Sequence, residues 1–150
     1  MSNRSNNKPR RHAFTLMEVM LVLVILVIIG GIAAVAFQTA DRNARIKAAD
    51  AQIKGFSTPL GMYRMDIDDF PASADGLQAL RTAPSGLANP AKWRGPYLDK
   101  DVPLDPWENP YSYEYPGKHQ TDQPDIWSFG PDQLDGTEDD IGNWSVVSSQ

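Results

Sequence analysis

The sequence predicts an α+β protein in which one long N-terminal helix packs on a small antiparallel sheet. The first observation is an apolar segment, because residues 19–37 carry no charged and no strongly polar side chain. The second is an apolar stripe at helical spacing that follows this segment. The third is a set of short alternating stretches near the C-terminus, which favours strands. Together they indicate a membrane helix joined to one small soluble domain.

The apolar segment is long enough to cross a bilayer. A helix over residues 19–37 extends about 28 Å, close to the hydrocarbon thickness of about 30 Å. A secretory signal peptide cut after Ala36 is one alternative, but its apolar core is usually only about 7–15 residues. A plain signal anchor is another, with Glu18 tolerated because it lies near the interface, and it leaves the stretch at residues 13–20 without a purpose. A carboxylate in hydrocarbon costs about 2.5–3.5 kcal/mol on insertion scales, so Glu18 is a functional candidate that needs a partner.

A second helical pattern continues beyond the membrane segment. Its apolar residues recur at steps of three and four, and they are Ile46, Ala49, Ile53, Phe56, Leu60 and Tyr63. Membrane segment and stripe therefore predict one helix of about 50 residues, roughly 75 Å long, whose second half packs on the sheet. Pro59 predicts a kink and is also compatible with a real break. A free anchor joined by a linker to a separate amphipathic helix is the alternative.

The remainder of the chain predicts a loop, a short helix and strands. Asp68, Asp69 and Pro71 end the long helix, and residues 74–80 are expected to form a short second one. Three later stretches are rich in aromatic and β-branched residues, some of them at alternating positions, which is typical of strands. The expected strands are residues 111–115, 125–130 and 143–147.

The amino-acid composition excludes several classes of function. The chain carries a net charge of −5, and without residues 1–13 ten basic side chains face nineteen acidic ones, a net charge of −9. An acidic domain argues against nucleic acid as a partner and is compatible with a bound cation. The 150 residues include no Cys, so the domain has no disulfide, and a metal ion is the usual substitute. His119 is the one His after the leader, and the chain has no nucleophile elbow, H-E-x-x-H or phosphate loop, so no enzyme is predicted.

Acidic residues concentrate in one loop near the C-terminus. Within nine positions they are Asp132, Asp135, Glu138, Asp139 and Asp140. Like charges at this density repel, so the loop is either spread out in solvent or neutralised by a cation. Oxygen ligands without nearby His or Cys favour Ca²⁺ over zinc or copper. The EF-hand spacing is absent, so a site here would be irregular.

The start of the apolar segment, Phe14-Thr15-Leu16-x-Glu18, resembles the class III leader of the type IV pilin and pseudopilin superfamily. The resemblance implies a pilin-like fold and cleavage by prepilin peptidase between Ala13 and Phe14. It also implies N-methylation of Phe14 and pairing of Glu18 with the Phe14 amine of a neighbouring subunit, where each charge offsets the desolvation of the other. The family usually has Gly before the cut, and this chain has Ala13.

Three further stretches resemble the major pseudopilin family of type II secretion. They are Gly76-Leu77-x-Ala79-Leu80, Asp105-Pro106-Trp107-x-Asn109-Pro110-Tyr111, and the tail from Asp125-Ile126 to Trp144. The resemblance implies a structural subunit that polymerises into the pseudopilus and drives protein export across the outer membrane. The alternatives are a type IV pilin, a minor pseudopilin, or a monomeric membrane-anchored calcium-binding module.

The same resemblance predicts organisation and partners. We expect a cleaved leader at 1–13, a transmembrane and assembly half-helix at 14–37, and a periplasmic globular domain at 38–150 that includes the amphipathic half-helix. The chain should cross the bacterial inner membrane once. Its expected partners are lipid before assembly, prepilin peptidase, further copies of itself, other pseudopilins and inner-membrane secretion components.

The resemblance also implies a structural Ca²⁺ in the acidic loop. The implied side-chain ligands are Asp132, Asp139 and Asp140, and the implied main-chain carbonyl ligands are Phe129, Leu134 and Thr137. Asp135 and Glu138 are then outer or solvent charges, and removing Asp135 is expected to have little effect.

Overall fold

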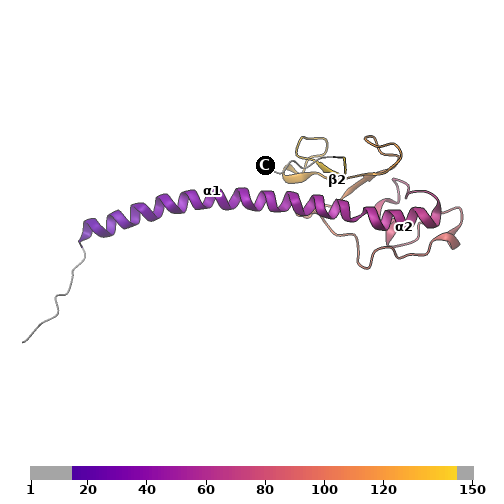
Figure 1. The fold of residues 1–150 in the computed structure, drawn as a ribbon, viewed down its shortest axis with the longest axis horizontal. Coiled ribbons are helices and arrows are strands. Elements are labelled where there is room, and N and C mark those ends of the chain that lie inside the picture. The colour runs from indigo at the N-terminus through magenta and orange to yellow at the C-terminus, as the bar shows by residue number, and fades with distance from the viewer. Residues whose placement is uncertain (1–14, 145–150) are drawn as a thin grey trace, which may run out of the picture. The chain divides into compact units, whose positions relative to one another are not determined.

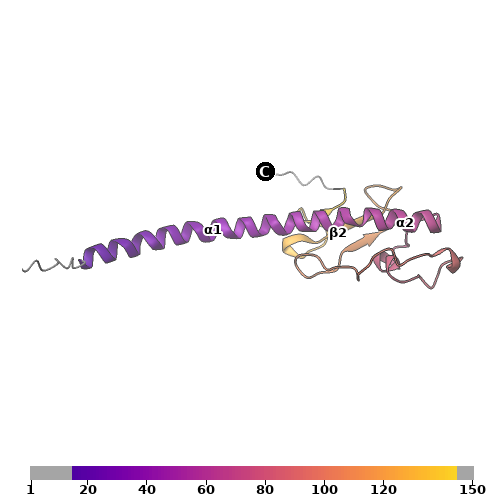
Figure 2. The same ribbon diagram turned by 60° about the horizontal axis from the view of Figure 1, so that its bottom comes forward.

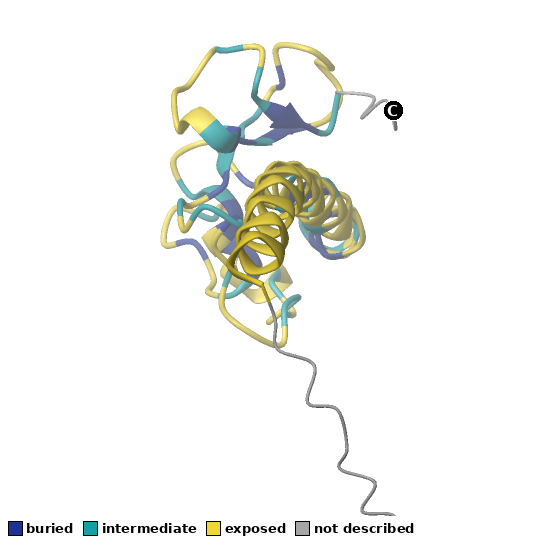
Figure 3. Cartoon of the chain, turned by 90° about the vertical axis from the view of Figure 1, so that its left-hand side faces the viewer, coloured by how far each residue is buried: buried dark blue, intermediate teal, exposed yellow. Residues whose placement is uncertain are grey.

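The computed structural model describes residues 15–144, and the chain divides after Ala40 into two compact units. The first unit holds the N-terminal turns of helix α1 (Leu16–Gly55). Its described side chains are almost all exposed, as the yellow turns in Figure 3 show. With α2 (Ser57–Ile67), α1 is long and apolar enough to cross a membrane, and none of its most apolar stretch is buried. These residues therefore need lipid or other helices to cover them.

The second unit packs helices on a small antiparallel sheet, which confirms the predicted α+β class. The sheet has the order β1-β2-β3, with β1 (Ser112–Glu114), β2 (Asp125–Ser128) and β3 (Ile141–Gly142). Tyr113 pairs with Ile126 and Ser128 with Ile141, both in antiparallel register. Within this unit the sheet lies along one side of the helices (Figure 1, Figure 2). The connections include three 3₁₀ helices, η1 (Gly76–Leu80), η2 (Pro90–Lys92) and η3 (Gly130–Asp132).

The long helix is interrupted at Phe56, between α1 and α2 and three residues before Pro59. Proline offers no N–H to the carbonyl of Gly55, four residues back. Phe56 nevertheless keeps helical dihedral angles, φ −72° and ψ −16°, and its carbonyl accepts the Leu60 N–H at 3.0 Å. The helix ends as predicted at Asp68, which adopts the left-handed conformation (φ 73°). The predicted single helix is thus right in extent, with an interruption of one residue.

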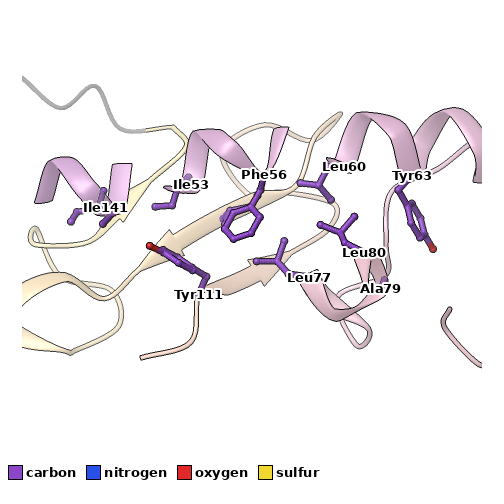
Figure 4. Close-up of a cluster of buried hydrophobic side chains, with 11 residues drawn as sticks. Ile53, Phe56, Leu60, Tyr63, Leu77, Ala79, Leu80, Tyr111 and Ile141 are labelled. Atoms are coloured by element: carbon purple, nitrogen blue, oxygen red, sulfur yellow. The ribbon is translucent and has the colours of Figure 1, made fainter. Parts of the chain in front are cut away.

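The apolar stripe forms the core of the second unit. Ile53, Phe56, Leu60 and Tyr63 are each at most 3% exposed. They face Leu77 and Leu80 of η1 and the ring of Tyr111 (Figure 4). The Phe56 and Tyr111 rings meet edge to face, with centroids 5.5 Å apart, which stabilises this junction beyond simple burial. The helical spacing therefore predicted the buried face of the second unit.

Two predicted elements differ from the structure in kind or position, and β1 and β2 are shorter than the strands predicted at 111–115 and 125–130. The short helix at 74–80 is the five-residue 3₁₀ helix η1, which begins at Gly76 with φ +56°. The third strand is β3 (Ile141–Gly142) rather than 143–147, of which 145–147 lie outside the described residues. At Asn143 the main-chain N–H still donates to the Ile126 carbonyl at 3.0 Å, but the Asn143 side chain accepts the Ile126 N–H at 3.1 Å and donates to the Pro124 carbonyl at 2.8 Å. The side-chain amide thereby takes one of the two hydrogen bonds that a continuing strand would make through its main chain.

Candidate functional site

The described chain begins at the helix start that carries Glu18. The Glu18 N–H donates to the Thr15 hydroxyl at 3.2 Å, so Thr15 caps α1. Glu18 itself is exposed. Ala13 and Phe14 lie outside the described residues, so cleavage, methylation and pairing remain predictions. Sequence reasoning missed the cap, although a Thr followed three residues later by Glu is the spacing of a capping box.

The acidic loop connects β2 to β3, and its two ends touch. Gly130 adopts φ +69°, and a Cβ at this position would overlap the carbonyl oxygen of Asp139. Glycine is therefore required here both for its dihedral angle and for the close approach. This contact brings the first turn of the loop beside Asp139 and Asp140, two of the predicted ligands.

Each of the three predicted carboxylate ligands contacts another group of the protein. Asp132 Oδ1 accepts the Leu134 N–H at 3.0 Å, and Asp140 Oδ2 accepts the Gly136 N–H at 2.8 Å. Asp139 Oδ2 lies 3.3 Å from Nη2 of Arg42 on α1. Among residues 15–144, these side chains form no cluster of three metal-binding groups. The three predicted carboxylates therefore lie in one loop, but they do not point at one common position.

Asp140 has an unused oxygen. Its Oδ1 is buried and has no hydrogen-bond partner among the described residues. Burial, and then the negative charges of Asp135 and Asp132, raise the pKa of the Asp140 carboxyl. A buried carboxylate oxygen surrounded by like charge is the kind of donor that a hard cation would satisfy. The Asp140 carboxylate therefore suits a hard cation in its chemistry.

Asp135 has a role that the sequence did not indicate. Its Oδ1 accepts the indole N–H of Trp127 on β2 at 2.9 Å. The Trp127 ring in turn lies 5.9 Å from that of Trp144, just after β3. Asp135 thus anchors the acidic loop to the sheet, so its description as an outer or solvent charge is incomplete. A contact between an indole and a carboxylate eight residues apart leaves no local pattern in the sequence.

Asp105 holds the loop before β1 against the start of the acidic loop. Its carboxylate is buried, and Oδ1 accepts the N–H groups of Trp107 at 2.9 Å and Asn109 at 2.8 Å. Oδ2 accepts from the hydroxyl of Ser128, whose oxygen accepts the Gly130 N–H at 3.1 Å. The sequence contains the Asp105-Pro106-Trp107 motif, but these hydrogen bonds of Asp105 were not predicted from it. Asp before Pro is a turn signal that could have suggested it.

A membrane-length helix, uncharged over residues 19–37, that continues into a helix packed on a small antiparallel sheet defines a pilin-like subunit. The chain is similar to a solved structure described as the major pseudopilin from the type 2 secretion system of enterohaemorrhagic Escherichia coli. The TM-score is 0.64 at 33% identity, over 73% of this chain and 94% of that one.

Sequence comparison gives the particular family. Residues 37–144 match the family model described as "Type II secretion system (T2SS), protein G", and residues 8–34 match the prokaryotic N-terminal methylation motif. Type II secretion system core protein G of Pseudomonas aeruginosa is 37% identical, over 90% of this chain and 96% of that protein. Its counterpart in Aeromonas hydrophila is 37% identical, over 95% of this chain and 99% of that protein. The chain belongs to the type II secretion protein G family, the major pseudopilins, which are structural subunits rather than enzymes.

Proposed function

We propose that this chain polymerises through its N-terminal helix into a type II secretion pseudopilus, and that the filament drives protein export across the outer membrane. The observation that carries the proposal is the exposed apolar surface of the first unit, where Leu21, Ile25 and Ile28 are 45–60% exposed. Lipid covers this surface before assembly, and helices of neighbouring copies cover it afterwards. The methylation motif over residues 8–34 supports the same conclusion.

The proposal includes topology and partners. Prepilin peptidase cuts between Ala13 and Phe14 at the cytoplasmic face, and α1 crosses the inner membrane once. The second unit then stands in the periplasm, where other pseudopilins and inner-membrane secretion components contact the growing filament. Electron microscopy of the overproduced chain tests assembly directly. Particles that never exceed one subunit would support the competing reading, a monomeric membrane-anchored calcium-binding module.

We expect the mature protein to begin at Phe14 and to carry a methyl group on its amine. Cleavage there leaves a free amine at the helix start, four residues before Glu18. Intact-mass and N-terminal peptide measurements on membrane-extracted protein check this. A mature protein that begins at Phe37, after Ala34-Val35-Ala36, would show that the segment is a secretory signal and would contradict the proposed assembly.

Glu18→Ala is expected to leave insertion and cleavage intact and to reduce filament formation strongly. Without the carboxylate, the amine of a neighbouring Phe14 is buried in the helix bundle without an opposite charge. The measurement is the amount and length of filaments sheared from cells, with Met17→Ala as the matched control in the same exposed turn. Filaments of normal number and length from the Glu18→Ala chain would refute the pairing.

We also propose that the acidic loop binds one structural Ca²⁺. Asp132, Asp139 and Asp140 supply carboxylate oxygens, and Phe129, Leu134 and Thr137 supply carbonyl oxygens. The buried Oδ1 of Asp140, which has no hydrogen-bond partner among the described residues, supports this proposal. The ion would neutralise a loop that otherwise concentrates like charge, and so stabilise a domain without cysteine.

A further inference from the structure

Arg42 ties the acidic loop to α1. Its Nη2 lies 3.3 Å from Oδ2 of Asp139, a residue 97 positions further along the chain. The Arg42 side chain is 55% exposed and that of Asp139 is 35% exposed. A guanidinium therefore already occupies one oxygen of a carboxylate that the proposed calcium site uses.

The other basic residues of this stretch of α1 have different surroundings. Arg45 donates to Asp41 and to the carbonyl of Pro106, each at 3.0 Å. Lys54 pairs with Asp50 at 2.7 Å, one helical turn earlier. Lys47 is exposed and carries the same charge as Arg42 on the same helix. The ion pair of Arg42 with the acidic loop is thus a specific contact rather than a general basic face.

Arg42 neutralises the loop only in part. It pairs with Asp139, whereas Oδ1 of Asp140 is buried and has no hydrogen-bond partner among the described residues. A divalent cation that binds both carboxylates and a guanidinium that holds one of them compete for the Asp139 carboxylate. They also repel each other at short range.

We propose that Arg42 is the resident counter-ion of the acidic loop and competes with Ca²⁺ for Asp139, so that calcium binding releases Arg42 from the loop. This inference rests on the proposed calcium site. Because the ion pair is exposed, it is weak enough to be displaced, and Arg42 lowers the affinity for calcium without abolishing it. The apparent affinity falls with the fraction of chains whose Asp139 is held by Arg42.

The test is a Ca²⁺ titration of the full-length chain in detergent by calorimetry. Arg42→Gln is expected to lower the Kd for Ca²⁺ roughly fivefold, the upper range for an exposed ion pair. Lys47→Gln, which removes the same charge from the same helix, should change the Kd by less than about twofold. In EGTA the Arg42→Gln chain should melt below the wild type, and in saturating Ca²⁺ the two should melt together.

A second readout uses the wild-type chain alone. Modification of Arg42 by phenylglyoxal, followed by mass spectrometry, should become faster when Ca²⁺ is added, while that of Arg45 should not change. An Arg42→Gln chain that binds Ca²⁺ as the wild type does, or more weakly, would overturn the competition while leaving the calcium site in place. A wild-type chain that binds no Ca²⁺ would remove the site and this inference with it.

Discussion

Asp105→Ala is expected to destabilise the second unit by roughly 3–5 kcal/mol, because three hydrogen-bond donors lose their acceptor at a cost of about 1–3 kcal/mol each. The carboxylate is 4% exposed, and its removal leaves the N–H groups of Trp107 and Asn109 without their acceptor. Ser128, which is fully buried, loses its acceptor as well. Small domains have only about 5–15 kcal/mol of stability in total, so this one substitution should bring the unit close to unfolding.

The matched variant is Asp105→Asn, which keeps the shape of the side chain. Its amide oxygen can still accept both main-chain N–H groups, and its amide nitrogen can donate to the Ser128 hydroxyl. The expected loss is about 1–2 kcal/mol. Urea unfolding of the full-length chain in detergent, followed by tryptophan fluorescence, measures both variants. A loss below about 1 kcal/mol for Asp105→Ala would show that the turn at Asp105 does not fix the sheet.

The fold was predictable where it depends on local periodicity. The spacing from Ile53 to Tyr63 gave the buried face of the helix, because side chains three and four positions apart share one side. A disturbance of the helix near Pro59 was predictable, but whether it would break the helix was not. It depends on Phe56 keeping helical dihedral angles while its ring packs against Tyr111, a residue remote in sequence. Tertiary contacts of this kind leave no trace in the neighbouring residues.

In the candidate site, too, the local features were predictable and the contacts between distant residues were not. Composition and family resemblance pointed to the acidic loop, and its binding of calcium stays a prediction. The contacts of Arg42 with Asp139 and of Trp127 with Asp135 were not predictable, because each joins side chains from different elements. The second contact changes the experimental design, since Asp135→Ala removes a hydrogen bond as well as a charge.

Removal of calcium is expected to lower the melting temperature of the second unit by roughly 10 °C. A ligand that binds only the folded state stabilises it by about 2.7 kcal/mol at a hundredfold excess over its Kd. For a domain of this size, each kcal/mol shifts the melting temperature by about 4 °C. The full-length chain in detergent should therefore melt earlier in EGTA and recover with Ca²⁺. It should recover much less with Mg²⁺, which demands a tighter octahedron.

Asp132→Ala should reproduce the effect of EGTA, because it removes a proposed calcium ligand. The Asp132 side chain is exposed and accepts the Leu134 N–H, so its truncation otherwise disturbs the fold little. Glu138→Ala is the control, since Glu138 is exposed, lies in the same loop and carries the same charge. A loop that is merely solvated treats the two substitutions alike, because each removes one like charge from a repelling cluster. A calcium site separates them, because only Asp132 holds the ion. If both substitutions change the melting temperature equally and only slightly, and if EGTA does not change it, then Arg42 and solvent neutralise this loop without calcium.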